Sequence, residues 1–348
     1  MKINHSMAFP ILAALLAHGM TMVASAGNES LPAANDSNDP RLALYLSNRL
    51  AAVTMTFDDA NPSQLERAKP LFDEFGYRCT FYVVTERIGP GSPTTWAQWK
   101  ATSDAGYEIG NHTSGHWLKG TNSTPEYDAW NRRQIMGGYE AIARNIGKPP
   151  LTFAFPGGGE NDYTRRLLSE SPHIDFRNYC HRLKGDRIYP EGDTLTATQA
   201  VAYIEKAIAH TKAWHGAELS WLLFYMHDVT EERARVLRVM LEYIRQHDDQ
   251  VWCDTYARVT LYERERESSG IVVSQREAGA VMFAVTNRLD AKVFNVPLTV
   301  LVPLPAAVTR AWAVRASSGT PVEATLRDRT LLVTAPPPGG PIRVQWRP

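Results

Sequence analysis

The chain has 348 residues, 37 Lys and Arg against 37 Asp and Glu, and 44% hydrophobic residues. This composition is typical of a globular protein and excludes long-range disorder, collagen-like repeats and coiled coil. With no net charge, nothing attracts the chain as a whole to nucleic acid, and we expect no nucleic-acid partner. The length indicates one large domain and a smaller one.

The N-terminus has the pattern of a secretory signal peptide. Lys2 precedes an apolar run from Ala8 to Val23, and Ala24-Ser25-Ala26 resembles a cleavage site. We therefore expect a signal peptide over residues 1–26 and a secreted or periplasmic protein. The alternative is a membrane anchor, but His18 interrupts a run that is short for a span of about 20 residues. No later segment is as apolar, so we expect no transmembrane span in the mature chain.

Residues 27–40 are small, polar and interrupted by Pro, and they indicate a linker. Strand-like and helix-like segments then alternate over residues 41–267. Expected strands cover residues 51–57, 79–84, 107–111, 151–155, 174–180, 221–226 and 251–253. Expected helices cover residues 62–75, 96–105, 126–146, 162–170, 198–214, 231–245 and 256–267. The alternation predicts a parallel α/β core, either a barrel or an open sheet, with its chemistry at the carboxyl ends of the strands.

Residues 271–348 differ from the preceding segment in their sequence pattern. They contain short β-rich runs separated by Pro, Gly and Asn, and no convincing helix. This pattern predicts a small antiparallel β-sandwich domain. A glycan-binding role and a stabilising or spacing role are equally compatible with this sequence.

Three cysteines, Cys79, Cys180 and Cys253, match no metal-binding spacing. In an exported protein an odd number leaves at least one thiol free or paired between chains. We expect buried structural thiols, because each lies in an apolar, strand-like stretch. A disulfide within the chain is the alternative, and the sequence does not select a pair.

His112 and His116 are four residues apart directly after an expected strand. In a helical turn their rings would lie on one face, about 6 Å apart, where they could hold one metal ion. Two surface histidines are the alternative reading. No Glu follows His112, as it does in the zinc metalloprotease motif, so that protease class is disfavoured.

Asp58 and Asp59 end the first expected strand. Neighbouring side chains on an extended segment point to opposite sides, so these two make a poor glycosidase pair. They can divide the work, one binding a metal and the other accepting a proton. His227 follows a continuous apolar strand, where it is a candidate acid or base near neutral pH. A turn that favours Asp and a capping histidine are the structural alternatives.

Together these segments resemble the polysaccharide deacetylases with the NodB homology domain, carbohydrate esterase family 4. The matching segments are Thr56–Asp59, the strand Cys79–Val83, Gly110–His116 with its His-[Ser/Thr]-x-x-His pattern, and Leu223–Asp228. The resemblance covers residues 48–265 and implies a distorted (β/α) barrel, here followed by the β-sandwich.

The resemblance also implies a site. Asp59, His112 and His116 would bind one divalent metal ion, usually Zn²⁺, with Co²⁺, Ni²⁺ or Mn²⁺ as alternatives. Asp58 would be the catalytic base, metal-bound water the nucleophile and His227 the general acid. The backbone N–H of Gly157 would stabilise the oxyanion.

The chain departs from the family pattern at two points. The third motif usually has an Arg two residues before its proline, but Ala154 stands there before Pro156; Arg177 or Arg182 could replace it in space. The Asp that supports the acid histidine has no clear match either. Asp175 and Asp254 are the candidates.

The sequence therefore predicts a metal-dependent hydrolase that removes acetyl groups from a glycan. An N-acetyl amide on a glucosamine-type sugar is the first choice, and an O-acetyl ester, as on xylan, is the second. A binding protein that keeps the fold without turnover is an alternative of another class, because the motif Arg is missing. Trp117, Tyr225 and Pro156 are candidate substrate contacts, Trp117 because its ring could stack on a sugar. The sequence does not determine the oligomeric state.

Overall fold

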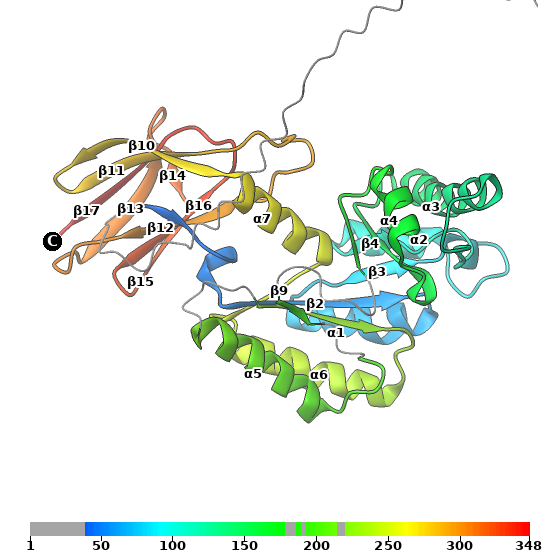
Figure 1. The fold of residues 1–348 in the computed structure, drawn as a ribbon. Helices are drawn as coiled ribbons and strands as arrows, with labels where there is room; N and C mark the ends of the chain where they lie inside the picture. Colours follow the sequence, from blue (N-terminus) through cyan, green and yellow to red (C-terminus); the bar gives the residue numbers. More distant parts are fainter. Residues whose placement is uncertain (1–38, 178–185, 189–191, 214–219) are drawn as a thin grey trace, which may run out of the picture. The chain divides into compact units, whose positions relative to one another are not determined.

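Figure 1 shows the computed structural model of the chain, which describes residues 39–177, 186–188, 192–213 and 220–348. The expected signal peptide and all but the last two residues of the expected linker lie outside these ranges. None of the described helices is long and apolar enough to cross a membrane.

The larger domain is built on one sheet with strand order β6-β5-β4-β3-β2-β8-β7, and β9 also pairs with β2. All of its strand pairs are parallel. The strands are β2 (Ala51–Asp58), β3 (Thr80–Val83), β4 (Glu108–Asn111), β5 (Thr152–Ala154), β6 (Asp175–Arg177), β7 (Asp186–Ile188), β8 (Ser220–Met226) and β9 (Val251–Cys253). Within the described residues the edge strands β6 and β7 do not pair with each other, so the sheet is a partial barrel.

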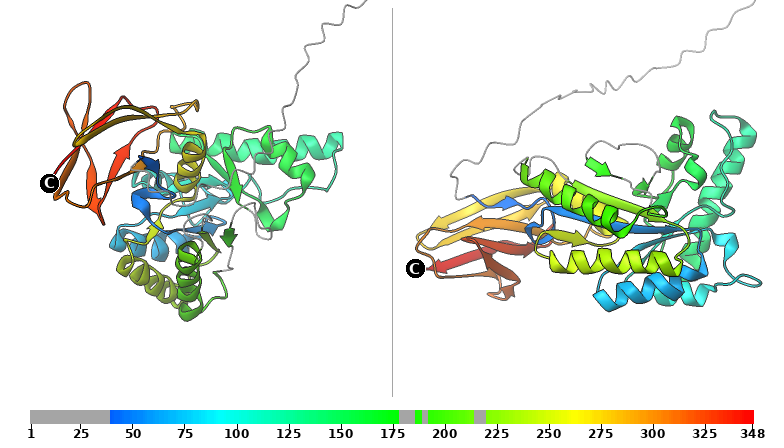
Figure 2. Two further views of the ribbon diagram at one scale, coloured as in Figure 1. Left: turned by 60° about the vertical axis from the view of Figure 1, so that its left-hand side comes forward. Right: turned by 90° about the horizontal axis from the view of Figure 1, so that it is seen from below.

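Helices connect these strands, as parallel pairing requires. They are α1 (Lys69–Phe75), α2 (Trp96–Asp104), α3 (Pro125–Ile146), α4 (Asp162–Ser169), α5 (Ala197–Ala213), α6 (Glu231–Gln246) and α7 (Tyr256–Ser268). The segment Gln64–Ala68 before α1 is π-helical. Helices α1, α5 and α6 cover one face of the sheet (Figures 1 and 2).

The two faces of β2 lie in different environments. Val53, Met55 and Phe57 belong to the apolar core that includes residues of α1, α5 and α6. On the other face, Thr54 accepts a hydrogen bond from the Trp221 indole at 3.0 Å. Asp58, on this second face, is fully buried at the end of the strand. Alternation along one strand therefore separates the helix-facing core from the polar interior.

The C-terminal domain is the expected antiparallel sandwich. One sheet has the order β1-β12-β16-β15 and the other the order β10-β11-β17-β13-β14. The strands are β1 (Arg41–Leu42), β10 (Gly270–Glu277), β11 (Ala280–Thr286), β12 (Leu298–Pro303), β13 (Arg310–Arg315), β14 (Pro321–Val322), β15 (Ala324–Arg327), β16 (Thr330–Ala335) and β17 (Ile342–Arg347). Apolar side chains from both sheets form one core.

The strand and helix positions expected from the sequence are confirmed to within a few residues, with two differences. Residue 41 does not begin the barrel, because β1 pairs with β12 as part of the sandwich. The short strands β1, β7 and β14 and the polar β15 carry too little alternation to be found from the sequence. Residues 178–180 of the expected strand 174–180 lie outside the described ranges.

Two of the three cysteines, Cys79 and Cys253, are buried and form no disulfide. Burial raises the pKa of both thiols, which keeps them protonated and unreactive. The expectation of buried structural thiols is confirmed for these two, and Cys180 lies outside the described residues.

Helix α7 joins the two domains through a shared core. Tyr256, Val259 and Tyr262 of α7 belong to the same apolar cluster as the sandwich residues. Farther along the helix, the buried Glu265 accepts a hydrogen bond from the Val296 backbone N–H at 2.9 Å. Its second oxygen is buried and has no hydrogen-bond partner among the described residues. Burial raises the pKa of Glu265 to about 7.

Glu265 should make the stability of the fold depend on pH. The folded protein holds this proton more tightly than the unfolded chain does, so stability falls as the pH rises from about 4.5 to about 7. Glu265→Gln keeps the acceptor for Val296 but cannot ionise. We expect the melting temperature of this variant to fall less between pH 5 and pH 8 than that of the wild type. Glu267→Gln, at an exposed neighbouring site, is the control; equal slopes in all three proteins would contradict the assignment.

Candidate active site

Three of the side chains selected from the sequence lie together where β2 and β4 end. Asp59, His112 and His116 each place one ligand atom within 4.8 Å of the others. Asp59 Oδ1 lies 3.2 Å from His116 Nε2 and 3.7 Å from His112 Nε2. Two imidazole nitrogens and one carboxylate oxygen are a donor set that suits Zn²⁺.

The burial and lack of hydrogen-bond partners of these three atoms also fit a metal ion. Asp59 Oδ1, His112 Nε2 and His116 Nε2 are buried and lack hydrogen-bond partners among the described residues. Burial lowers the pKa of His112 to about 4 and lowers that of His116 as well, so both rings are neutral at neutral pH, as metal ligands must be. The Ala154 carbonyl accepts a 2.8 Å hydrogen bond from His112 Nδ1, which directs Nε2 to the cluster.

The backbone that carries these ligands is unusual. Asp59 has φ of 81° and His116 has φ of 67°, in the left-handed region that non-glycine residues rarely adopt. Thr113, with φ of 69°, accepts a hydrogen bond from His116 N on its side chain at 2.9 Å. The α3 residue Gln134 accepts the Gly115 N–H at 2.8 Å. The surrounding contacts thus hold a strained turn of the kind that clusters at functional sites.

The left-handed backbone at Asp59 also corrects an expectation. Strand alternation should have sent the Asp58 and Asp59 carboxylates to opposite sides. Instead Asp58 Oδ2 lies 3.8 Å and Asp59 Oδ1 3.7 Å from His112 Nε2. The strand ends at Asp58, so the alternation does not continue to the next residue.

Asp58 is hydrogen-bonded to an arginine from the edge strand of the sheet. The Arg177 guanidinium, from β6, donates a short hydrogen bond to Asp58 Oδ2, and both side chains are almost completely buried. The rings of Tyr82 and Tyr225 lie 5.2 and 5.4 Å from the guanidinium carbon. Burial would raise the pKa of Asp58, but the charge and hydrogen bond of Arg177, with smaller contributions from the two nearby histidines, hold it below its ordinary value. Asp58 is therefore ionised at neutral pH.

His227, at the end of β8, is paired with Asp193. Its Nδ1 donates to Asp193 Oδ2 at 2.5 Å, and its backbone N–H donates to Oδ1 at 3.1 Å. Arg233 contacts the same carboxylate at 2.9 Å. The hydrogen bond to Asp193 raises the pKa of His227 although burial opposes it. The ring is therefore biased toward its protonated form.

A buried amide connects the two strand ends. Gln64 Nε2 donates to the backbone carbonyls of Asp58 at 2.5 Å and of His227 at 3.0 Å. Arg87 approaches from another side, with Nη1 3.0 Å from Asp59 Oδ1. Neither side chain was singled out in the sequence, because no local pattern places it beside the motifs.

The other residues predicted to contact the substrate differ in how far they are buried. Pro156 is buried, and Gly157 follows it with φ of 56° and no atom within 4 Å of the position that a Cβ would take. Tyr225 is 8% exposed, and its ring centroid is 6.2 Å from that of His227. Trp117 is 62% exposed, directly after His116. Its role in binding substrate stays a prediction, as do those of Tyr225 and Pro156.

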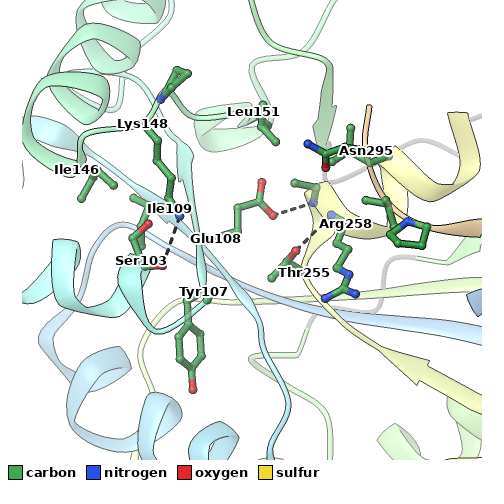
Figure 3. A pocket seen from close by; sticks show the side chains of 16 residues that line it. Ser103, Tyr107, Glu108, Ile109, Ile146, Lys148, Leu151, Thr255, Arg258 and Asn295 are labelled. Carbon is green, nitrogen blue, oxygen red and sulfur yellow. Dashed lines mark hydrogen bonds between the residues drawn. The ribbon is translucent and has the colours of Figure 1, made fainter. Parts of the chain in front are cut away.

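A separate pocket of about 410 Å³ lies at the other end of the strands, where β4 and β5 begin. Figure 3 shows Glu108 there, pointing to the N-terminus of α7. Glu108 accepts hydrogen bonds from Ala257 N at 2.8 Å and from the hydroxyls of Thr80 and Thr152. Burial nevertheless raises its pKa. These contacts fasten α7 to the sheet, so we assign Glu108 a structural task.

Residues 48–173 match the family model described as polysaccharide deacetylase. This segment belongs to the polysaccharide deacetylase family. It contains Asp58, the cluster of Asp59, His112 and His116, and Gly157, but it ends before Arg177, Asp193 and His227. One departure from the family pattern, Ala154, therefore lies inside the matched segment, whereas Arg177, Asp193 and His227 lie beyond it.

The chain is also similar to a gellan lyase from Bacillus sp., with 25% identity over 335 residues. The match covers 88% of this chain but only 13% of that protein. Two similar solved structures are the T48 deacetylase with substrate and a family 4 acetyl xylan esterase from Clostridium thermocellum in complex with cobalt. Both are 22% identical to this chain, and each match covers 60% of it. The matches cover 90% and 89% of the two solved chains, with TM-scores of 0.41 and 0.43.

The two departures from the family pattern can be compared with the contacts that the structure shows. Ala154, where the motif arginine is expected, holds His112 through its backbone, and Arg177 on the next strand contacts the base candidate. Arg182, the other candidate, lies outside the described residues. The expected partners of His227 were wrong: Asp254 accepts from Trp252 at 3.1 Å and Asp175 from Thr260 at 3.2 Å.

Removing one member of the cluster should abolish metal binding. We expect the wild type to bind about one equivalent of Zn²⁺ in calorimetric titration and to melt at a higher temperature when Zn²⁺ is added. Asp59→Asn and His116→Ala should lose both effects. His247→Ala, which removes a histidine on the far end of α6, should keep them. Equal zinc binding in all four proteins would place the metal elsewhere.

Proposed function

We propose that this protein is a metal-dependent deacetylase that hydrolyses acetyl groups on a polysaccharide or oligosaccharide. The observation that supports this best is the arrangement around Asp59, His112 and His116. An ionised, arginine-held carboxylate, Asp58, lies beside this cluster, and an aspartate-paired histidine, His227, ends the neighbouring strand β8. With the signal-like N-terminus, we also propose that it works outside the cytoplasm.

A divalent ion such as Zn²⁺, bound by these three side chains, would supply Lewis acidity toward the acetyl carbonyl and lower the pKa of water. The residues of the chain do the rest. Asp58 is ionised and buried, and Arg177 fixes its Oδ2, so the carboxylate is ready to accept the proton of the attacking water. In this proposal Asp58 is the base.

In this proposal His227 is the proton donor. Because Nδ1 donates to Asp193, Nε2 is the nitrogen from which a proton would pass to the leaving amine or alcohol. Asp193 keeps the ring protonated to higher pH than an isolated histidine. Base and acid thus have pKa values moved apart by their partners, a pattern typical of acid–base catalysis.

Gly157 is our candidate for oxyanion stabilisation through its backbone N–H. Its left-handed backbone and the open space around it allow the close approach of a substrate carbonyl. In this proposal the exposed ring of Trp117 stacks on a sugar of the substrate.

We propose an N-acetyl amide as the scissile group. An amine leaves with difficulty unless it is protonated, and the raised pKa of His227 supplies that proton near neutral pH. An O-acetyl ester needs less help from an acid and is the second candidate. A binding role without turnover is the competing class.

A substrate panel tests these proposals. Acetate release is measured with chito-oligosaccharides, peptidoglycan, acetylated xylan and an aryl acetate, before chelation, after chelation and after zinc is restored. We expect release that chelation abolishes and zinc restores. Release from the sugar amides identifies an N-deacetylase, and release from xylan alone identifies an esterase. No release from a zinc-loaded protein that still binds these glycans would support the binding role.

Asp58→Asn tests the base. The substitution preserves the shape of the side chain but removes the proton acceptor, so we expect acetate release to fall by at least about 100-fold. Zinc binding should persist, because the three ligands are untouched. Asp228→Asn, on the exposed residue after His227, is the matched control and should retain turnover. Undiminished release by Asp58→Asn would refute the assignment of the base.

Asp193→Asn tests the acid through its pH dependence. Loss of the carboxylate lowers the pKa of His227, so the protonated form is lost at lower pH. We expect the alkaline limb of the kcat profile for an amide substrate to move to lower pH. An activated aryl acetate, which needs little acid assistance, is the internal control. A limb that stays in place would mean that His227 is not the acid.

A further inference from the structure

The outer face of the five-stranded sandwich sheet brings together cationic and aromatic side chains from two strands. β13 and β17 are neighbouring strands (Figure 1). Their register places Arg310 opposite Arg347, Trp312 opposite Gln345, and Val314 opposite Arg343. The alternate residues Ala313, Ile342 and Val344 are buried in the sandwich core. The first set therefore points away from the core.

Trp312 lies at the centre of this face. The guanidinium carbons of Arg310 and Arg347 are 5.8 and 5.7 Å from its ring centroid, within the range of cation–π contacts. Its indole N–H donates to Gln345 Oε1 at 3.2 Å. The ring is thus held in place while part of it stays accessible, because Trp312 is only partly buried.

The charge of this face is not balanced by the protein. Arg343 is paired with Glu277 of β10, but within the described residues neither Arg310 nor Arg347 forms an ion pair. Both are exposed. Residues 271–348 carry nine Lys and Arg against four Asp and Glu, although the whole chain is neutral. Positive charge is therefore concentrated in the sandwich.

We propose that this face, formed by Arg310, Trp312, Gln345 and Arg347, is a non-catalytic binding site for a carboxylated polysaccharide. Guanidinium groups bind planar carboxylates through paired hydrogen bonds, and an indole offers a flat surface for a sugar ring. Side chains of one strand face recur about every 6.8 Å, so Gln345 and Arg347 can contact successive groups along an extended chain. We propose an acidic glycan and not nucleic acid as the ligand of this face. Glu277 borders the face, and only two of its cations lack ion-pair partners among the described residues.

Calorimetric titration of the full chain with polygalacturonate tests this site without any turnover. Fully methyl-esterified polygalacturonate is the matched ligand, because it has the same backbone without the carboxylates. We expect binding of the first and none of the second. The double variant Arg310→Ala, Arg347→Ala should bind at least about tenfold more weakly.

Two further variants separate the site from general charge. Trp312→Ala should weaken binding several-fold, while Trp312→Phe keeps an aromatic ring and most of the affinity. Arg133→Ala with Arg235→Ala removes two exposed arginines from the barrel helices and should change nothing. Equal loss in both arginine double variants, or no loss with Trp312→Ala, would overturn the proposal in favour of nonspecific charge attraction.

Two other polyanions complete the test. Dextran sulfate and a short DNA duplex should each bind more weakly than polygalacturonate, and tighter binding of either would overturn the proposal. Because acetate release is not measured here, failure of this site and failure of the deacetylase proposal give separate results.

Discussion

The contact between Arg177 and Asp58 is the constraint on which the site depends. Their strands, β6 and β2, are separated by β5, β4 and β3 in the sheet. In a flat sheet these two strands would lie about 19 Å apart, far beyond the reach of one side chain. The contact therefore requires the sheet to curve round its own interior. The same curvature brings the carboxyl ends of β2, β4 and β8 toward a common centre.

This contact also carries an energetic condition. A buried ion pair gains little over an apolar core, but loss of one partner leaves an unpaired buried charge that costs about 3–5 kcal/mol. Removing either Asp58 or Arg177 would therefore destabilise the fold, and the rings of Tyr82 and Tyr225 both lie within cation–π distance of the guanidinium. A motif arginine on β5 is not required, because β6 offers a second position from which the same carboxylate can be reached.

The sequence was sufficient to predict the fold class and the cluster of Asp59, His112 and His116, because the patterns that reveal them are local. Strand and helix periodicity extends over whole segments, and His112 and His116 are close in the chain, so short patterns reveal them. Asp193 and Arg177 come from distant segments, and their roles depend on how far the sheet curves, which no spacing encodes. The same holds for the sandwich surface, where strand register alone unites β13 with β17. The orientation of Asp59 was missed because its left-handed backbone departs from the strand geometry that the pattern implies.

The apolar cluster shared by α7, the barrel strands and the sandwich has a consequence for the organisation of the chain. Ala52 and Trp221 of the barrel belong to the same core as Val281 and Phe283 of the sandwich, without a polar boundary between them. The strand β1 adds a second connection, because residues that precede the barrel complete a sandwich sheet. The two domains are therefore interdependent in folding: a chain cut after α7 would expose apolar surface and lose the partner of β1. Such a sandwich is an integral part of the folded unit and not an exchangeable module.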